Sequence, residues 1–489
     1  MNRNLARLVY PAFRFGLSEY EAAERLVDMG VGGFCLYKGT VSSITEFTRR
    51  MRARAKGPLL FCADYEDGPG RFAEGASLLP SNMAIAASGS ADLARRKGEI
   101  TAAEAKAMGV HWVLAPVLDL ADRPENPIVN VRAFSDKEET VISMAEAYMN
   151  GLSSSGTLTC VKHFPGHGDT EKDSHLQLPV LKRTISQLKS HELKPFMSLC
   201  KQADSVMIGH LKIDDVDPDV PASFSKAAIS GLLRETVGYD GCVVTDALSM
   251  KAVSDENSAG LMALLAGADI LLVPDDPFKL LESLEKAYGE NSLPDAVLER
   301  ALRHQIEMIG KLGPRWLDDQ PGREIIDGPA HREYVRLAAP ECLAWLKKPQ
   351  AQPFYPGETV RYMEPAVSDP EKWSGKAFVD ELKKCGVNVV SAYEGTGGRL
   401  LAASFSRPQA YSGMINLNPS EREEILRRIE GNGKMTLVSF GSPFVFAGFA
   451  PRLETGLCAF CAVNEFQRAA ARALTGKGPA NGTMPVSLD

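Results

Sequence analysis

The chain has 489 residues, of which 44% are hydrophobic, and this length exceeds what one hydrophobic core usually organises, so two domains are predicted. The formal net charge of -7 at pH 7 excludes a large cationic surface for nucleic acid or anionic lipid. We therefore expect a small-molecule partner, with no nucleic acid and no membrane among the partners.

The N-terminal segment MNRNLARLVYPAFRFG carries basic residues, but Pro11, Arg14 and Gly16 interrupt it before the apolar core of a signal peptide develops. No stretch of about 18 apolar residues, the length of a spanning helix, follows it. Most of the nine cysteines lie in apolar runs, which indicates reduced thiols packed in a core, Cys458 and Cys461 included. A cytoplasmic protein without a metal or other cofactor is expected.

Short apolar runs rich in β-branched residues recur along the first part of the chain, and a longer segment with helical periodicity follows each of them. Several of these segments begin at a Ser or Asp that can cap a helix and end at Gly. The eight apolar runs occupy residues 8–14, 32–37, 59–64, 111–119, 157–164, 205–211, 241–247 and 268–274. Eight buried strands alternating with helices predict an α/β fold of the (β/α)8 TIM-barrel type, because such strands must be covered on both faces.

Charged or imidazole side chains stand at the ends of five of the predicted strands, namely Asp64, Asp119, Lys162 with His163, His210 and Asp246. In a barrel, these ends meet at one rim, where the loops after the strands build the active site. Polar residues also end strands without any further role, but Ser, Gly or Asn would serve a turn better than these side chains. The strand ends therefore predict a polar site at this rim.

A long helical segment at residues 292–313 is expected to close the barrel. The segment after it is rich in Pro, Gly and charged residues, so we place the barrel at residues 1–315 and a linker at 316–355. Past the linker, five apolar runs alternate with three helical segments. They predict a second, smaller α/β layered domain at residues 356–489.

Residues 162–175, KHFPGHGDTEKDSH, bring three of the eight histidines into one loop. Pro165 and Gly166 prevent the helix on which His163 and His167 would share a face, and the Glu of an HExxH zinc site is absent. We therefore expect no metal. The loop also lacks the GxxxxGK[ST] order of a phosphate-binding loop, so ATP binding is not expected.

General acid–base catalysis fits this loop better. Asp173 stands two positions before His175, where it can accept the second ring proton, fix the tautomer and hold the pKa of the imidazole in a range where the ring gives and takes a proton. The upstream glycines would allow the loop to move over the rim. A capping Asp beside a surface His is the commoner role of an isolated DSH tripeptide, so the assignment depends on the surrounding motif.

The motif KHFPGHGDTEKDSH and the strand-end segment VVTDALSMKAV at 243–253 resemble glycoside hydrolase family 3, and specifically its β-N-acetylglucosaminidase branch, the NagZ-like enzymes. The segments at 115–136 and 205–241 resemble the same family. The tail from LVSFGSPFVF at residue 437 onward resembles the C-terminal domain of two-domain members. The resemblance spans nearly the whole chain and implies a barrel enzyme that cleaves glycosidic bonds.

The resemblance implies that Asp246 is the nucleophile that forms a covalent glycosyl-enzyme. An ionised carboxylate at a strand end suits this role, because it meets the positive charge that develops at the anomeric carbon. In this branch a histidine replaces the usual second carboxylate, and His175 matches that position with Asp173 as its partner. His175 would protonate the leaving oxygen and then deprotonate the incoming water.

The family's contacts to the sugar hydroxyls match Asp64, Arg132, Lys162 and His163 of this chain. Relatives typically have QEGGR after the binding aspartate and then a further arginine, whereas this chain has DYEDGPGRF from residue 64 and no second arginine nearby. Arg71 is expected to take the first arginine's place with a shift of one residue. His210 is expected to line the pocket, and His167 to form a structural hydrogen bond within the loop.

Several functions stay open at this point. The first is a retaining exo-β-N-acetylglucosaminidase that removes terminal GlcNAc from cell-wall fragments or chitooligosaccharides. The second is a glycoside phosphorylase, since a neutral imidazole at the acid–base position does not repel phosphate as a carboxylate would. A non-catalytic sugar-binding or sensor protein and a metal-dependent barrel hydrolase are the others. Whether the C-terminal domain completes the pocket or only supports the barrel stays open as well.

Overall fold

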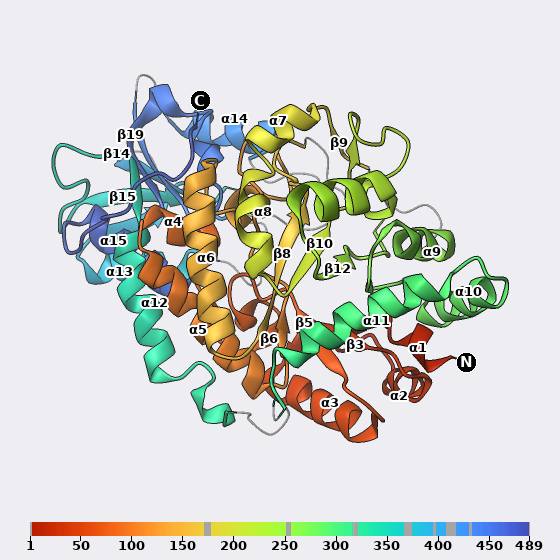
Figure 1. Cartoon of the computed structure of the whole chain (residues 1–489). Coiled ribbons are helices and arrows are strands. Elements are labelled where there is room, and N and C mark those ends of the chain that lie inside the picture. The colour runs from red at the N-terminus through yellow and green to blue at the C-terminus, as the bar shows by residue number, and fades with distance from the viewer. Residues whose placement is uncertain are drawn as a thin grey trace.

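The strands and helices of the chain follow the alternation of apolar runs and helical segments in the sequence. The structure, a computed structural model, describes residues 2–170, 178–250, 256–314, 316, 321–365, 374–394, 398–406, 417–429 and 433–488. An N-terminal barrel is followed by a smaller layered domain (Figure 1). Both are α/β units, as the sequence predicts.

The barrel is a ring of parallel strands, and its seven-stranded part has the order β2-β3-β5-β7-β8-β10-β12. The strands are β1 (Val9–Tyr10), β2 (Ala12–Arg14), β3 (Gly33–Tyr37), β5 (Leu60–Ala63), β7 (Trp112–Val113), β8 (Leu158–Phe164), β10 (Ser205–Ile208), β12 (Cys242–Thr245) and β13 (Leu271–Leu272). Pro11 has no N–H to donate and divides the first strand into β1 and β2. Because β1 pairs with β13 and a bridge joins Val244 to Ile270, the ring closes and the predicted (β/α)8 barrel is confirmed.

Helices cover the outside of the ring (Figure 1). They are α2 (Tyr20–Met29), α3 (Val41–Arg54), α5 (Ala91–Ala107), α6 (Glu138–Ser154), α8 (Lys194–Leu199), η5 (Ala227–Val237), α9 (Glu256–Ala266), α10 (Pro277–Gly289) and α11 (Asp295–Gly310). Side chains cap several of them, since Thr40 accepts from the N–H of Ser43 at the start of α3 and Ser90 accepts from the N–H of Leu93 in α5. The connecting segments hold smaller elements, namely α1 (Arg3–Ala6), β4 (Gly39–Thr40), β6 (Ala73–Glu74), α4 (Asn82–Ala87), β9 (Val180–Leu181), α7 (Ile185–Ser190) and β11 (Lys212–Ile213).

Side chains fill the inside of the ring, and several of them are small thiols. Trp112 meets Tyr10 edge to face with ring centroids 5.7 Å apart, and its Nε1 donates to Ser205 Oγ at 3.0 Å. Four cysteines pack in the same cluster, namely Cys35, Cys62, Cys160 and Cys242. All nine cysteines lie among the described residues, and each is buried and outside any disulfide, which confirms their predicted place in the core.

The second domain is built on a six-stranded sheet of order β14-β19-β18-β17-β15-β16, parallel except for the β14–β19 pair. Its strands are β14 (Ala344–Lys347), β15 (Thr359–Met363), β16 (Asn388–Ser391), β17 (Arg399–Ser404), β18 (Met435–Ser439) and β19 (Leu453–Cys458). Its helices are α12 (Pro329–Cys342), α13 (Lys376–Lys384), α14 (Pro419–Arg428) and α15 (Asn464–Leu474). The segment predicted as a linker, 316–355, holds α12 and β14 and is thus more ordered than its composition indicates, while the domain boundaries stay a prediction.

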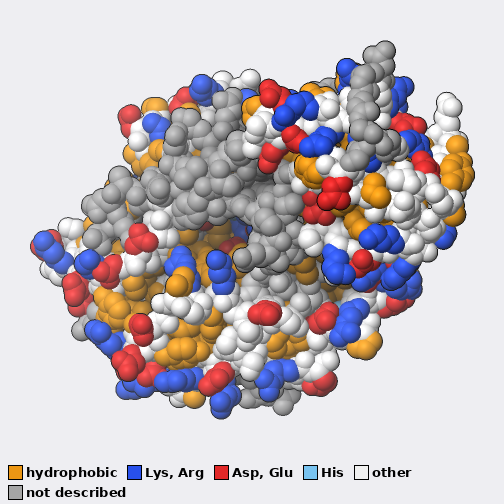
Figure 2. Space-filling view, turned by 180° about the vertical axis from the view of Figure 1, so that it is seen from behind, with side chains coloured by type: hydrophobic (Ala, Val, Ile, Leu, Met, Phe, Trp, Pro, Cys, Tyr) orange, Lys and Arg blue, Asp and Glu red, His pale blue; other side chains and the backbone are white. Residues whose placement is uncertain are grey.

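The second domain packs beside helices α4 and α5 of the barrel (Figure 1). Side-chain hydrogen bonds join the two parts, namely Ser81 to Phe460, Asn130 to Ser442 and Tyr334 to Leu93. On the face shown in Figure 2, Lys and Arg side chains are interspersed with Asp and Glu side chains over the described surface. Among the described helices, none combines the length and the apolar character that a membrane span requires.

Candidate active site

The carboxyl ends of the barrel strands surround a cavity of about 400 Å³. Six residues that the sequence analysis selected line this cavity, namely Asp64, Arg71, Arg132, Lys162, His163 and Asp246. They come from different strands and loops, so the closure of the barrel brings them together. The sequence analysis missed further polar and aromatic lining residues, namely Arg14, Tyr37, Lys38, Glu66 and Phe72.

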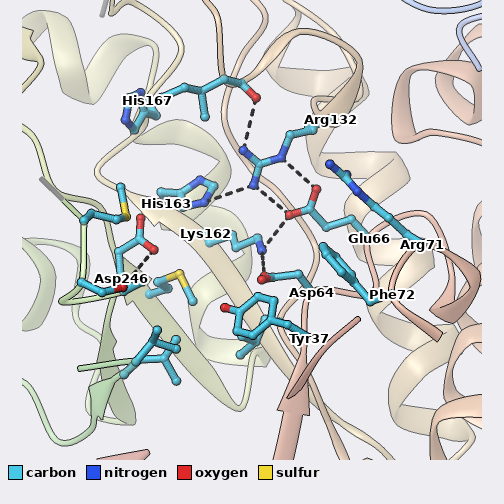
Figure 3. A pocket seen from close by; sticks show the side chains of 18 of the residues that line it. Tyr37, Asp64, Glu66, Arg71, Phe72, Arg132, Lys162, His163, His167 and Asp246 are labelled. Carbon is cyan, nitrogen blue, oxygen red and sulfur yellow. Dashed lines mark hydrogen bonds and ion pairs between the residues drawn. The ribbon is translucent and has the colours of Figure 1, made fainter. Parts of the chain in front are cut away.

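One wall of the cavity is a group of four charged side chains, Asp64, Glu66, Arg132 and Lys162, which we call the ion-paired wall (Figure 3). Lys162 Nζ lies 2.7 Å from Asp64 Oδ1 and 2.7 Å from Glu66 Oε1. Arg132 holds both oxygens of Glu66, through Nε at 2.9 Å and Nη2 at 2.8 Å. The side chains of Lys162 and Glu66 are 1% and 2% exposed, whereas Asp64 retains 26%. Burial of these charges is tolerated because each has a partner of opposite sign.

Three members of the ion-paired wall, Glu66, Arg132 and Lys162, keep their charges across the neutral range. Burial alone would raise the pKa of Glu66, but the cations of Arg132 and Lys162 hold that pKa well below its usual range. Burial alone would lower the pKa of Lys162, but the carboxylates of Asp64 and Glu66 raise it above its usual range. Despite burial, Glu66 likewise raises the pKa of Arg132. At pH 7 one buried anion therefore faces two cations.

Asp119, a buried residue that follows β7, orients His163. Its Oδ2 accepts a hydrogen bond from His163 Nδ1 at 2.7 Å, which leaves Nε2 of the ring 3.5 Å from Arg132 Nη2. Its Oδ1 accepts from the backbone N–H of His163 at 3.2 Å and of His167 at 2.8 Å. Burial alone would raise the pKa of Asp119, but His163 holds it below the usual value. One carboxylate thus fixes the tautomer of a histidine in the cavity.

His167 lines the cavity and is held within its own loop. Its Nδ1 donates to Thr170 Oγ1 at 2.7 Å, and that hydroxyl donates to the carbonyl oxygen of His167 at 2.9 Å. Burial lowers the pKa of His167 to about 4, so the ring is neutral. Asn126 Nδ2 donates to the carbonyl oxygens of His167 and Gly168, at 2.9 and 3.0 Å. The predicted structural hydrogen bond of His167 is confirmed.

Asp246 lies across the cavity from the ion-paired wall, at the end of β12 (Figure 3). Its backbone N–H donates to the carbonyl oxygen of Ile208 at 3.0 Å, and its Oδ1 accepts from the N–H of Ala247 at 2.8 Å. The residue is half-buried. This placement provides a carboxylate on one side of a cavity whose other side can bind hydroxyl groups.

The prediction that His210 lines the pocket is wrong. The residue is completely buried and is not part of the cavity wall. Its Nε2 donates to the carbonyl oxygen of Ala247 at 3.1 Å, and its Nδ1 lies 2.7 Å from Ser223 Oγ. Both ring nitrogens are engaged inside the protein, so His210 supports the residue after Asp246 and does not face the cavity.

The segment DYEDGPGRF still delivers an arginine to the cavity, although its spacing departs from that of the relatives. Arg71 Nη1 lies 3.8 Å from Asp67 Oδ2, and the guanidinium lies 5.5 Å from the centre of the Phe72 ring. Tyr37 meets Phe72 edge-on at 5.9 Å, and Arg14 lies over Tyr37 at 5.3 Å. The cavity therefore has a cationic and aromatic side beside Asp64. A contact between Arg71 and the sugar stays a prediction.

The predicted acid–base pair, Asp173 and His175, lies outside the described residues. Within the described part of the chain, no group of three or more His, Cys, Asp and Glu side chains is placed to hold a metal ion. The geometry thus supports the arrangement of the predicted sugar contacts around Asp246, and the acid–base pair remains a prediction.

Residues 2–308 match the family model described as the glycosyl hydrolase family 3 N terminal domain. A β-hexosaminidase of Idiomarina loihiensis is 34% identical over 267 residues, which cover 52% of this chain and 80% of that protein. Among solved structures, a glycoside hydrolase family 3 β-N-acetylglucosaminidase from Paenibacillus sp. str. FPU-7 has a TM-score of 0.87 at 26% identity, over 100% of this chain and 99% of that one. A β-glucoside phosphorylase has the same fold, with a TM-score of 0.91 at 23% identity, over 100% and 94% of the two chains. The chain therefore belongs to glycosyl hydrolase family 3.

Proposed function

We propose that this chain is a retaining glycosidase that releases terminal β-linked N-acetylglucosamine. The relatives named β-hexosaminidase and β-N-acetylglucosaminidase support this substrate class. The observation that carries the proposal is the cavity in which the carboxylate of Asp246 lies across from the ion-paired wall. A glycosidase of this type needs both features, a carboxylate at the anomeric carbon and fixed partners for the hydroxyl groups of one sugar.

In this proposal the ion-paired wall binds the sugar hydroxyls. Asp64 retains exposure and accepts hydrogen bonds, whereas Lys162 and Arg132 donate them from positions that Glu66 fixes. His163 presents Nε2 beside Arg132 because Asp119 holds the other ring nitrogen. Groups that are already held by one another need little rearrangement when the sugar binds, so the binding energy is available for orientation.

Asp246 is the nucleophile of the proposed reaction. One of its oxygens bonds to the anomeric carbon while the bond to the leaving oxygen breaks, and His175 donates its ring proton to that oxygen. In the second step, His175 takes a proton from water, whose oxygen bonds to the anomeric carbon as the bond to Asp246 breaks. Asp173 orients the ring and stabilises its charged form. Two inversions at the same carbon retain the configuration.

Replacement of the nucleophile tests this proposal. Asp246→Asn should lower kcat for an aryl β-GlcNAc by about 10⁴-fold, since the covalent step has no replacement nucleophile. Asp240→Asn is the control, because Asp240 is 85% exposed and lies outside the cavity. A fluorosugar that traps the glycosyl-enzyme should label the peptide with Asp246, as mass spectrometry detects. A label on another residue, or retained activity, rejects the assignment.

Transfer of the sugar to phosphate is the second candidate, and the charge of the cavity favours it. Of the described residues that line the cavity, five are cationic, namely Arg14, Lys38, Arg71, Arg132 and Lys162, and three are carboxylates, namely Asp64, Glu66 and Asp246. This excess of positive charge attracts an anionic acceptor, and a neutral imidazole at the acid–base position does not repel one. Products formed with and without phosphate decide between the two. GlcNAc-1-phosphate as the main product identifies a phosphorylase, and free GlcNAc at an unchanged rate identifies a hydrolase.

We also propose a cytoplasmic location. All nine cysteines, each of them a described residue, are buried and outside any disulfide, as is common where thiols stay reduced. Cell-wall fragments or chitooligosaccharides in the cytoplasm would be the substrates. Immunodetection in fractionated cells tests the location, and recovery in an extracytoplasmic fraction contradicts it.

A further inference from the structure

Arg132 lies in a connecting loop and not in a barrel strand. It ends the short turn η2 (Asn130–Arg132), between β7 and α6. Its guanidinium donates to both oxygens of Glu66. The position of this short turn therefore determines where the Arg132 guanidinium lies in the cavity. The turn is not part of a barrel strand, so contacts with other elements hold it in place.

The first contact joins the start of the turn to the second domain. Asn130 has φ of 39°, a left-handed conformation that Asn adopts more readily than most residues. Its Oδ1 accepts from the N–H of Val131 at 2.8 Å, and its Nδ2 donates to Ser442 Oγ at 2.9 Å. Asn130 and Ser442 are 1% and 0% exposed, so water cannot readily replace either partner.

The backbone of the second domain fixes Ser442 in turn. The N–H of Ser442 donates to the carbonyl oxygen of Ser406 at 2.7 Å, and its carbonyl oxygen accepts from Ser439 Oγ at 2.6 Å. A Cβ on Gly441 would stand 1.8 Å from the carbonyl oxygen of Ser406, so only glycine permits this close approach. The hydroxyl that meets Asn130 is therefore presented from a backbone with little freedom.

The second contact holds the end of the turn. Asn82 Nδ2 donates to the carbonyl oxygen of Arg132 at 2.7 Å, and Asn82 Oδ1 accepts from Lys97 Nζ at 2.6 Å. The preceding residue, Ser81, caps α4 and donates to the carbonyl oxygen of Phe460 in the second domain at 2.9 Å. Both ends of the turn are thus held by contacts that lead to the second domain.

We propose that the second domain positions the Arg132 guanidinium in the cavity through the hydrogen bond between Ser442 and Asn130. Every described residue of the cavity wall comes from the barrel, and the loop with Arg132 links that wall to the second domain. Ser442 and Asn130 are positioning residues. The inference rests on the proposed function, since it takes Arg132 to contact the sugar.

Two substitutions remove the hydrogen bond from opposite sides. Ser442→Ala removes the acceptor, and Asn130→Gly removes the donor while glycine keeps the left-handed backbone without strain. Each should raise KM for an aryl β-GlcNAc about 3- to 10-fold, the effect of one hydrogen bond, with a smaller change in kcat. Tyr334→Phe is the control, because it removes another hydrogen bond between the two parts, a part-buried one of 2.8 Å to the carbonyl oxygen of Leu93. Unchanged KM in both test variants overturns the proposal, as does an equal rise in the control.

The decisive readout is Ser442→Ala in an Arg132→Gln background. If the second domain acts through Arg132, the added substitution leaves kcat/KM of Arg132→Gln within about twofold, although it still lowers Tm. A further loss as large as in the wild-type background shows that Ser442 acts by another route and overturns the proposal. If Arg132→Gln alone keeps the wild-type kcat/KM, the sugar contact assumed in the proposed function fails instead.

Discussion

Two buried carboxylates, Glu66 and Asp269, stand at opposite ends of the barrel, each among cationic or imidazole side chains. Glu66 is 2% exposed and is held by Arg132 and Lys162 at the carboxyl ends of the strands. Asp269 is 0% exposed at the amino end of β13. Its side-chain partners are Arg234 at 3.0 Å, Arg300 at 3.1 Å and His304 at 2.8 Å. Judged by partners alone, the two clusters are nearly equivalent.

The surroundings separate the two carboxylates. Glu66 borders the cavity that also contains Asp64 and Asp246. Asp269 also accepts the backbone N–H of Val243 at 2.9 Å, so it joins α11 and η5 to the strands inside the fold. In barrel enzymes the carboxyl ends of the strands carry the active site and the amino ends serve stability. Location in the barrel therefore assigns a function that the side-chain chemistry alone does not.

The largest expected effect comes from neutralising each carboxylate. Glu66→Gln takes the counter-charge of Arg132 and one of the two carboxylate partners of Lys162, and Asp269→Asn takes the counter-charge that Arg234 and Arg300 share. Each substitution should cost about 3–5 kcal/mol of stability. Glu66→Gln should also lower kcat/KM for an aryl β-GlcNAc about 100-fold, because Arg132 and Lys162 lose the charge-assisted bonds that fix them. Asp269→Asn should leave kcat/KM within about twofold, since this cluster lies at the stability end of the barrel. Denaturant unfolding and steady-state kinetics at 25 °C measure both.

The control for this comparison is an exposed ion pair. Asp380→Asn removes the partner of Lys376, whose side chain is 79% exposed, and should leave the free energy of unfolding nearly unchanged, because solvent screens this pair. Equal losses of kcat/KM in Glu66→Gln and Asp269→Asn would remove the distinction between the two ends of the barrel.

A smaller loss of activity is expected from substitution of His210, which supports the residue after Asp246. His210→Phe removes the two hydrogen bonds that the ring makes to Ser223 and Ala247. The Ser223 hydroxyl then loses its partner on the ring, and the Ala247 carbonyl keeps the N–H of Met250, at a cost of about 1–3 kcal/mol in stability. Because Ala247 adjoins Asp246, kcat should fall about tenfold while KM changes less. Initial rates over a range of aryl β-GlcNAc concentrations give both constants. A rise in KM without a fall in kcat would place His210 in sugar binding after all.

The barrel and the strand-end residues could be predicted because topology determines where they meet. All eight apolar runs became strands, since parallel strands buried on both faces give a continuous apolar signal. Asp64, Lys162, His163 and Asp246 stand directly at the ends of such strands, so the closure of the ring brings them to one cavity. The family motif added Arg132, which lies in a loop whose position no periodicity indicates.

What the sequence did not reveal depends on the direction of side chains and on contacts between distant segments. Glu66 lies three residues past the end of β5, and this spacing does not show that its side chain returns to Arg132 and Lys162. His210 stands at a strand end, but its ring turns to Ser223, which lies 13 residues away in a loop. The strand β14 was assigned to the linker because its pairing with β19 joins segments more than 100 residues apart.

Glu66 and Lys162 of the ion-paired wall do not titrate near neutral pH, so we expect the affinity for the sugar to be independent of pH there. The folded pKa of Glu66 lies below the unfolded value of about 4.3, so the stability from its ion pairs is present above that pH and is lost as the pH falls through the folded pKa. The folded pKa of Lys162 lies above the unfolded value of about 10.4, so its contribution is present below that pH and is lost as the pH rises through the folded pKa. Between about pH 5 and 9 neither group titrates, and the affinity of Asp246→Asn for GlcNAc, measured by calorimetry, should stay within about twofold. An affinity that changes tenfold near pH 6 to 7 would show that a histidine, and not the ion-paired wall, controls the binding of the sugar.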